Sequence, residues 1–448
     1  MYRNIFHDYD IRGRYPGEIN ETVFYNLGRA IAQVSKTKKI AIGRDARLSS
    51  DTLFLYLAAG LSGSKVKVTD LGRVSTPFGL WYARYFKTDT LVVTASHNPK
   101  DQNGLKIFSA KLGAVSKNSG LSKIKARFDK LNMAGPPVLP ESIRHAYPKH
   151  EPGREYAAFV LRWVKKMPPG KIKIAVDFSH GVSGREFESV LGKLKIDFNT
   201  LNEAPNGNFP THGPNPLEVA SQKGIAALMK TKKFGLGAVI DGDGDRILFM
   251  DENGRMVDPA YIFSLILDAE PVKIKTAVKT VSVAKVVDTV AGRNKIKLVV
   301  SKVGRTNIQR VMEKEKAIMG VEKSGHYFFK DFYYGDSSLF ALLAVLKIIT
   351  LEKKPLSGLL EPYRQYVIFP EISLPFEGRV DRIIGDLKSK YQDGKINQLD
   401  GLTVEYPSWR FNLRRSHTEN VWRLNLEGKN KDELEKIKAD IISVLSAQ

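Results

Sequence analysis

Apolar, β-branched runs in this chain repeatedly end in small or acidic residues and are followed by segments with helical spacing. They read KKIAIGRD, DTLVVTASHNP, KIKIAVDFSHG and LGAVIDGDGDR. A buried strand followed by a turn and a helix is the repeating unit of α/β proteins. Ligands of such sheets gather at the carboxyl ends of the strands, where loops and helix N-termini present unpaired N–H groups. The chain is therefore predicted to be an α/β protein with its functional site at these strand ends.

The pattern is interrupted in ways that indicate several domains, as expected for a chain of 448 residues. A Pro-rich polar stretch covers residues 135–153, and the turn DENG follows the run that contains the aspartates. From about Tyr366 onward, short strands are followed by one helix, DELEKIKADIISVLSA. This last segment predicts a smaller α+β domain.

The composition excludes several classes of site and partner. The chain has no cysteine, so it has no disulfide, thiolate zinc site or thiol nucleophile. No apolar run approaches the roughly 20 residues that cross a bilayer, and the start carries no signal-peptide core, so we expect a cytoplasmic protein without a membrane partner. A net charge of +22 attracts anionic metabolites and polyanions alike. Without an RNA-binding signature or zinc-finger spacing, no nucleic-acid partner is expected.

Ser96 lies in the turn ASHNP, directly after a strand-like run. This position suits a nucleophile. The G-x-S-x-G elbow of the α/β hydrolases is absent, so acyl hydrolysis is disfavoured. The alternative for an isolated ASHNP is a structural turn in which Ser96 and Asn98 cap a helix.

Asp241, Asp243 and Asp245 alternate with glycines in DGDGDR. Hard carboxylate oxygens at this density favour Mg²⁺ or Ca²⁺, because three close negative charges repel one another without a cation. An EF-hand is disfavoured because its sixth position requires glycine and here holds Arg246. A phosphatase in which Asp241 is the nucleophile and Asp243 the acid-base group stays open.

Two further segments carry ligand-binding side chains. Arg414, Ser416 and Thr418 in RRSHT suit a phosphate, because guanidinium groups and hydroxyls satisfy its oxygens. Glu322 and Ser324 in GVEKSGH suit sugar hydroxyls. Each segment taken alone is equally compatible with an exposed basic turn or a simple strand end.

Taken together, YDIRG, GRD, TASHNP, DGDGDR, E-x-S-G-H and R-x-S-x-T resemble the α-D-phosphohexomutase family, and its phosphomannomutase/phosphoglucomutase branch more than its phosphoglucosamine mutase branch. The resemblance implies three similar α/β domains with mixed sheets and a smaller α+β C-terminal domain, arranged around a central active-site cleft. The expected domains are 1–152 with a phosphoserine loop, 153–251 with a metal loop, 252–365 with a sugar-binding loop and 366–448 with a phosphate-binding loop.

The resemblance also implies an activity and site residues. The enzyme would interconvert hexose 1-phosphate and hexose 6-phosphate, of mannose or glucose, through a phosphoserine, with Mg²⁺ and with hexose 1,6-bisphosphate as intermediate and activator. It would act on a small phosphosugar as a monomer or homodimer. The implied catalytic residues are Ser96, His97, Lys106, Arg12 and Arg246, with Lys106 as the proton-transfer partner. The implied metal ligands are Ser96, Asp241, Asp243 and Asp245. The implied substrate-binding residues are Tyr9, Arg305, Glu322, Ser324, His326, Arg414, Ser416, His417 and Thr418.

The chain departs from the family pattern at three places. Arg305 stands where relatives of this branch often have histidine, GDSSL at Gly335–Leu339 replaces paired aspartates, and RRSHTEN lacks the usual closing proline. These departures concern substrate choice more than the serine or the aspartates.

Phosphoglucosamine mutase is the nearest alternative function. A Mg²⁺-dependent phosphatase and a non-catalytic anion-binding protein are the alternatives of other classes.

Overall fold

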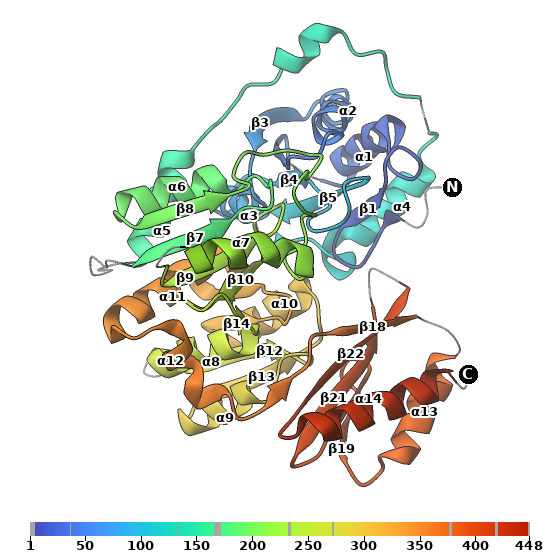
Figure 1. The fold of residues 1–448 in the computed structure, drawn as a ribbon. Coiled ribbons are helices and arrows are strands. Elements are labelled where there is room, and N and C mark those ends of the chain that lie inside the picture. The colour runs from blue at the N-terminus through green and yellow to red at the C-terminus, as the bar shows by residue number, and fades with distance from the viewer. Residues whose placement is uncertain are drawn as a thin grey trace. The chain divides into compact units, whose positions relative to one another are not determined.

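The computed structural model describes residues 5–35, 37–133, 135–164, 172–231, 234–270, 273–375, 379–416 and 420–446. It divides into two compact units, each drawn as ribbon in Figure 1. The first unit comprises Met1–Val257 and Ser324–Leu356, and the second comprises Asp258–Lys323 and Ser357–Gln448. Each unit is described by itself below.

The first sheet of the first unit is mixed and has the order β1-β5-β4-β2-β3, with β6 paired to β5. Strands β2, β3 and β4 are parallel, while β5 is antiparallel to β4 and β1. The strands are β1 (Ile11–Arg14), β2 (Lys39–Arg44), β3 (Lys67–Arg73), β4 (Thr90–Val93), β5 (Gln102–Ser109) and β6 (Gly113–Ala114). The helices are α1 (Glu21–Val34), α2 (Ser50–Ser62), α3 (Thr76–Tyr85) and α4 (Ser122–Lys130), and the short π-helical turn η2 (Lys117–Leu121) precedes α4.

Helix ends in this part follow local sequence signals. The Asn20 side chain accepts a hydrogen bond from the Val23 N–H (3.0 Å) and so caps α1. Ser75 caps α3 in the same way, and Pro77 lies in its first turn. Glycines at Gly28 and Gly60 let α1 and α2 approach closely, since a Cβ at Gly60 would lie 2.1 Å from the Tyr25 carbonyl oxygen.

The second sheet of the first unit is also mixed, with the order β11-β10-β9-β7-β8. Strands β7, β8 and β9 are parallel, and β10 is antiparallel to β9 and β11. The strands are β7 (Lys173–Asp177), β8 (Asp197–Leu201), β9 (Leu236–Ile240), β10 (Ile247–Met250) and β11 (Met256–Val257). The helices are α5 (Gly153–Val164), α6 (Gly184–Lys193) and α7 (Val219–Thr231), and the 3₁₀ turn η3 (Glu141–His145) precedes α5.

The first unit also contains a later segment of the chain. This segment has the antiparallel strands β15 (Tyr327–Phe329) and β16 (Gly335–Asp336), the turn η4 (Lys330–Phe332) and helix α11 (Ser338–Glu352).

The second unit contains a parallel three-strand group in which β12 lies between β13 and β14. These strands are β12 (Thr276–Thr280), β13 (Lys297–Ser301) and β14 (Met319–Val321), and the helices are α8 (Pro259–Ala269), α9 (Val286–Arg293), α10 (Arg305–Glu315) and α12 (Leu356–Leu360). After the turn η5 (Glu361–Tyr363), an antiparallel sheet follows with the order β17-β22-β21-β20-β19, and β18 also pairs with β22. Its strands are β17 (Val367–Ile368), β18 (Ile372–Pro375), β19 (Lys395–Asn397), β20 (Leu402–Glu405), β21 (Trp409–Arg415) and β22 (Val421–Gly428), and its helices are α13 (Val380–Lys390) and α14 (Lys431–Ser446).

The sheet architecture confirms the predicted α/β class and the α+β character of the C-terminal segment. The four predicted domain ranges stay predictions. None of the helices in the described part of the chain combines the length and the apolar character that crossing a bilayer requires.

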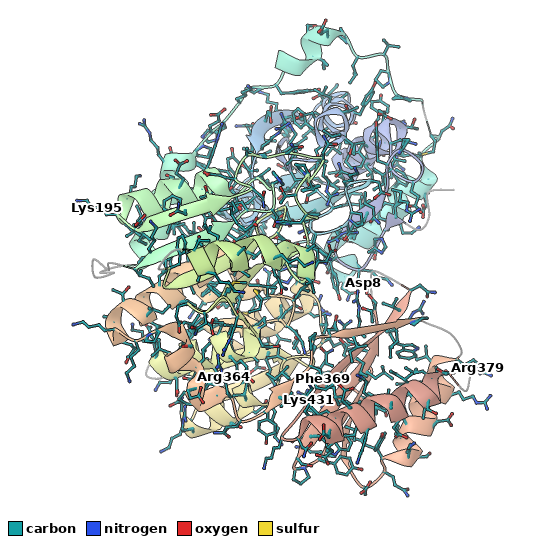
Figure 2. The ribbon with its side chains drawn as sticks, viewed as in Figure 1. Asp8, Lys195, Arg364, Phe369, Arg379 and Lys431 are labelled. Atoms are coloured by element: carbon teal, nitrogen blue, oxygen red, sulfur yellow. The ribbon has the colours of Figure 1, made fainter. Side chains whose placement is uncertain are left out.

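Basic side chains on the surface account for part of the positive charge. Lys195 and Arg379 are both exposed, and Figure 2 shows each of them projecting from the ribbon into solvent. Isolated lysines and arginines of this kind are typical of a solvated surface rather than of a binding site.

Candidate active site

Ser96 lies in a tight turn between β4 and β5 of the first unit. Its side chain is buried, and its backbone has a φ of 54°, which places a non-glycine residue in the left-handed region. The Thr94 hydroxyl accepts a hydrogen bond from the Ser96 N–H (2.8 Å). No helix begins here, because the chain continues into β5 at Gln102. The alternative in which Ser96 and Asn98 cap a helix is therefore wrong.

The aspartates of DGDGDR converge at the carboxyl end of β9, and all three are buried. Ser96 Oγ donates to Asp241 Oδ2 (3.1 Å), so the serine turn and the aspartate loop meet. Gly244 has a φ of 75°, which lets the loop fold back so that Asp241 Oδ1 accepts the N–H groups of Asp245 (3.0 Å) and Arg246 (3.1 Å). The residues after the loop form β10, and this excludes the EF-hand.

Lys106 and Thr76 hold the other two carboxylates. Lys106 lies on β5 opposite Val92 of β4, and its ammonium forms ion pairs with Asp243 (2.6 Å) and Asp245 (2.7 Å). Thr76, the first residue of α3, donates its hydroxyl to Asp243 Oδ2 (2.5 Å). In the described structure the ammonium of Lys106 contacts these carboxylates rather than Ser96 Oγ, so its predicted proton-transfer role stays a prediction.

The electrostatics of the aspartate loop differ from one carboxylate to the next. Burial, together with the charges of Asp245 and Asp243, holds the pKa of Asp241 well above its usual range. Burial and Asp245 act in the same direction on Asp243, but Lys106 and Thr76 outweigh them and lower its pKa. Asp243 Oδ1 is buried and has no hydrogen-bond partner among the described residues. Carboxylate oxygens of all three aspartates lie within 4.8 Å of one another, which suits a hard divalent cation.

Two histidines border the aspartate loop. His97 Nδ1 is 3.4 Å from Ser96 Oγ, and burial, followed by the charges of Arg246 and Arg12, holds the pKa of His97 well below its usual range. His326 contacts Asp245 Oδ1 through Nε2 (3.2 Å) and Ser324 Oγ through Nδ1 (2.8 Å). His97 therefore lies beside the serine in surroundings that disfavour its charged form.

Two arginines approach the same place from different strands. Arg246 Nε is 3.9 Å from Asp241 Oδ2 and 3.4 Å from His326 Nε2. Arg12, on β1, is held by Asp10 (2.8 Å) and donates to Asn98 Oδ1 (2.8 Å) in the serine turn. Tyr9 precedes Asp10 and is partly buried. All the predicted catalytic residues thus belong to one group in the first unit, in which Ser96 and Lys106 are buried and Arg12, His97 and Arg246 are half-buried.

The remaining predicted substrate residues lie in the second unit. Glu322 directly follows β14, is buried, and accepts the N–H of Gly304 through Oε1 (2.7 Å). Arg305 is the first residue of α10. Glu322 and the start of the helix that carries Arg305 are therefore neighbours.

The predicted phosphate clamp lies at the end of β21, so Arg414 is a strand residue rather than a loop residue. Its Nη2 is 3.5 Å from Glu371 Oε2, and its buried Nε has no hydrogen-bond partner among the described residues, which leaves a donor for an anion. The Ser416 N–H donates to the Val421 carbonyl (2.9 Å). His417 and Thr418 lie outside the described residues.

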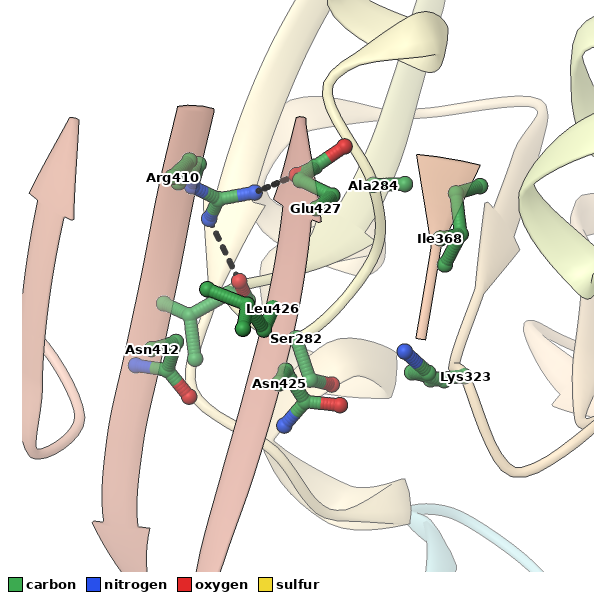
Figure 3. Close-up of a pocket in the computed structure, with 10 residues that line it drawn as sticks. Ser282, Ala284, Lys323, Ile368, Arg410, Asn412, Asn425, Leu426 and Glu427 are labelled. Carbon is green, nitrogen blue, oxygen red and sulfur yellow. Dashed lines mark hydrogen bonds and ion pairs between the residues drawn. The ribbon is translucent and has the colours of Figure 1, made fainter. Parts of the chain in front are cut away.

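The same sheet packs on the loop after β12. Arg410 donates to the carbonyl oxygens of Val281 (2.5 Å) and Val283 (3.0 Å) and pairs with Glu427 (3.1 Å). Figure 3 shows Arg410 and Glu427 at a small polar pocket that Asn412 and Asn425 also line. The strand that ends in the clamp is thus fixed, within the second unit, to the end of β12.

The structure adds site residues that the sequence interpretation missed. Thr76 contacts Asp243, and Arg47 donates to the backbone of the serine turn. Arg47 lies two positions after the motif GRD. A charged residue so soon after a strand-like apolar run was the signal in the sequence that could have indicated it as a site residue. For Thr76 there was no comparable signal, because its partner is distant in sequence.

Glu186 links α6 to the N-terminus of α3 and yields a pH prediction. The Ser75 N–H and hydroxyl donate to its two carboxylate oxygens (2.9 and 2.6 Å), yet burial raises its pKa to about 7. Between about pH 4.5 and pH 7 the Glu186 carboxyl holds its proton in the native state but has lost it in the unfolded state. The free energy of unfolding therefore falls as the pH rises through this range. The expected loss is on the order of 2 to 3 kcal/mol.

Glu186→Gln is expected to remove this pH dependence, because the amide is neutral throughout. Urea unfolding between about pH 5 and pH 8 measures the slope. Glu188→Gln, on the exposed face of the same helix, is the matched control and should keep it. An unchanged slope in Glu186→Gln would contradict the assignment.

Comparison with known families finds three matching models. They are the phosphoglucomutase/phosphomannomutase alpha/beta/alpha domain I over residues 3–134, domain II over 154–254 and domain III over 258–366. Together they account for most of the chain.

Similar proteins cover the chain from end to end. A phosphomannomutase of Methanocaldococcus jannaschii is 32% identical over 99% of this chain and 98% of its own. A phosphomannomutase of Escherichia coli is 31% identical, with 98% of each chain covered. A crystal structure of a phosphoglucomutase/phosphomannomutase family protein from Burkholderia thailandensis superposes with a TM-score of 0.85 at 27% identity, over 99% of this chain and 97% of that one.

Proposed function

This chain belongs to the phosphoglucomutase/phosphomannomutase family and is a hexose phosphate mutase, and we propose that it moves the phosphoryl group through Ser96. The observation that carries the proposal is the hydrogen bond of the buried Ser96 hydroxyl to Asp241 (3.1 Å), within the group of three aspartates. A serine turn with a purely structural role has no need of this arrangement, because it buries three carboxylates whose charge Lys106 and Arg246 balance only in part.

We assign Asp241, Asp243 and Asp245 as the protein ligands of Mg²⁺, with the Ser96 phosphate completing the set. Bound Mg²⁺ would supply positive charge that stabilises the transferring phosphoryl group. The unpartnered Asp243 Oδ1 and the raised pKa of Asp241 support this assignment. Lys106 supplies part of the compensating charge to Asp243 and Asp245.

In the proposed transfer, the phosphorus–oxygen bond to Ser96 breaks while a sugar hydroxyl oxygen forms a new bond to phosphorus. The proton of that hydroxyl is released, and a proton returns to the serine oxygen. Lys106 is the proposed proton-transfer partner: as a neutral amine it would accept the proton of the sugar hydroxyl, and as the resulting ammonium it would give that proton to the serine oxygen. His97 Nδ1 lies 3.4 Å from Ser96 Oγ in the same group of residues. The hexose 1,6-bisphosphate so formed would return its other phosphate to Ser96.

We assign substrate recognition to Glu322, Ser324 and His326 for sugar hydroxyls and to Arg414 and Ser416 for the distal phosphate. The free donor on the buried Arg414 supports the clamp, because a phosphate needs several N–H groups and a guanidinium offers them in a planar fork. Mannose and glucose phosphates are the proposed substrates.

A direct test incubates the purified protein with glucose 1,6-bisphosphate and Mg²⁺ and looks for the mass of one phosphoryl group on the peptide that contains Ser96. We expect transfer, followed by turnover of mannose 1-phosphate and glucose 1-phosphate when these are added. Faster turnover of glucosamine 1-phosphate would favour the phosphoglucosamine mutase. Release of inorganic phosphate without isomerisation, with no label on Ser96, would favour the phosphatase and contradict the proposal.

Arg414→Lys is expected to raise the KM for hexose 1-phosphate about tenfold with little change in kcat, because a single ammonium cannot replace the guanidinium fork. Initial rates over a range of substrate concentrations measure both constants. Arg379→Lys, an exposed change in the same unit, serves as control. A loss confined to kcat would contradict a role in binding the distal phosphate.

A further inference from the structure

We propose that Arg47 is a positioning residue that holds the Ser96 turn in its reactive conformation, an inference that rests on the proposed role of Ser96. Arg47 follows β2 in the first unit, and only 1% of its surface is exposed. It forms no described hydrogen bond or ion pair with the Ser96 hydroxyl or with the carboxylates of Asp241, Asp243 and Asp245, so its contacts act on transfer through the turn.

The guanidinium of Arg47 binds the backbone of the turn at four points. Its Nη2 donates to the carbonyl oxygens of Ser96 (2.8 Å) and Asn98 (2.6 Å). Its Nη1 donates to those of Pro99 (2.5 Å) and Gln102 (2.9 Å). Four carbonyl dipoles therefore point at one cation, which pins the chain from the serine to the start of β5.

The remaining contacts fix Arg47 itself. Its Nε donates to Asp45 Oδ2 (3.1 Å), while Asp45 Oδ1 accepts the Arg47 N–H (3.0 Å) and the Ser50 hydroxyl (2.5 Å). The ring of Phe209 lies 5.5 Å from the guanidinium carbon. All five guanidinium N–H donors are used, so the side chain acts as a rigid template rather than as a mobile charge.

The turn needs such a template for two reasons. Ser96 occupies the left-handed region at a φ of 54°, which a non-glycine residue leaves unless its surroundings hold it. Four carbonyl oxygens that converge also repel one another without a cation between them. Without the guanidinium, we expect the turn to relax and Ser96 Oγ to move away from Asp241 Oδ2. A shift of this kind, of about 1 Å, costs a reaction on the order of a hundredfold in rate.

Arg47→Lys tests the proposal, because an ammonium keeps the charge but cannot reach four carbonyls in one plane. We expect kcat to fall about a hundredfold, with KM changed less than about threefold. Single-turnover transfer from glucose 1,6-bisphosphate to Ser96 should slow equally, and the amides of residues 96–102 should exchange hydrogen faster.

Arg44→Lys is the matched control. Arg44 ends the same strand and pairs with Asp51 and Asp70, and its side chain makes no described contact with the serine turn. It should lose a similar amount of thermal stability and keep the wild-type kcat and the wild-type exchange of residues 96–102. A purely structural role of Arg47 predicts that the two variants behave alike, and that result would overturn the proposal.

Two further outcomes keep this proposal separate from the proposed function. If wild-type Ser96 takes up no phosphoryl group, the proposed function fails. The positioning role is then judged by hydrogen exchange alone, and equal exchange of the amides of residues 96–102 in Arg47→Lys and wild type would overturn it.

If Arg47→Lys does not fold, Asp45→Asn is the second variant, because it removes the charge that orients Nε and keeps Arg47. It should lower kcat about tenfold, and an unchanged kcat would contradict the proposal.

Discussion

Replacing Ser96 by alanine is expected to reduce mutase turnover by at least about a thousandfold, because the proposed cycle has no other acceptor for the phosphoryl group. The methyl group fills nearly the same space as the hydroxymethyl group and removes only the hydrogen bond to Asp241 (3.1 Å). The fold should therefore persist. Conversion of mannose 1-phosphate to mannose 6-phosphate, measured with added bisphosphate and Mg²⁺, checks the prediction.

Ser64→Ala provides the matched control for this variant. Ser64 lies in the turn after α2, and its hydroxyl donates to the Gly60 carbonyl (3.2 Å) away from the aspartate loop. Its loss should leave turnover unchanged. Full mutase activity in Ser96→Ala would show that another group carries the phosphoryl group, with Asp241 as the next candidate.

Asp241→Asn is expected to change activity and stability in opposite directions. Burial and the neighbouring carboxylates raise the pKa of Asp241, so its ionised form destabilises the metal-free fold at neutral pH. An amide removes this charge and keeps an oxygen for the N–H groups of Asp245 and Arg246. The variant should melt at a higher temperature than wild type without metal, yet lose on the order of a hundredfold or more in turnover.

The metal dependence of thermal unfolding separates this explanation from simple damage to the fold. Mg²⁺ should raise the melting temperature of the wild type and leave that of Asp241→Asn nearly unchanged, since a ligand stabilises only a state that binds it. Asp197→Asn, an exposed change at the start of β8, should respond to Mg²⁺ as the wild type does. A wild-type protein that Mg²⁺ does not stabilise would contradict the metal assignment.

The positions of the main site residues along the fold were predictable from local sequence. Ser96 follows β4, Asp241 follows β9 and Glu322 follows β14, each at the carboxyl end of a buried strand. Apolar runs of β-branched residues reveal such strands, and the polar residue that ends each run must lie at the sheet edge. The phosphate clamp was predicted less accurately, because it was expected to be a loop. Arg414 instead lies within strand β21.

Local sequence patterns were enough to predict the α/β class, the strand ends that carry polar groups and the chemical types present there. Which of these groups meet follows from the packing of the sheets: Lys106 meets Asp243 and Asp245, Thr76 meets Asp243, and Arg47 meets the Ser96 turn. Periodicity assigns a side chain to a face of its own strand or helix, whereas contacts between elements far apart in sequence depend on how whole sheets pack. The buried serine hydroxyl became a candidate phosphoryl carrier through that packing, which brought it against a carboxylate from another sheet.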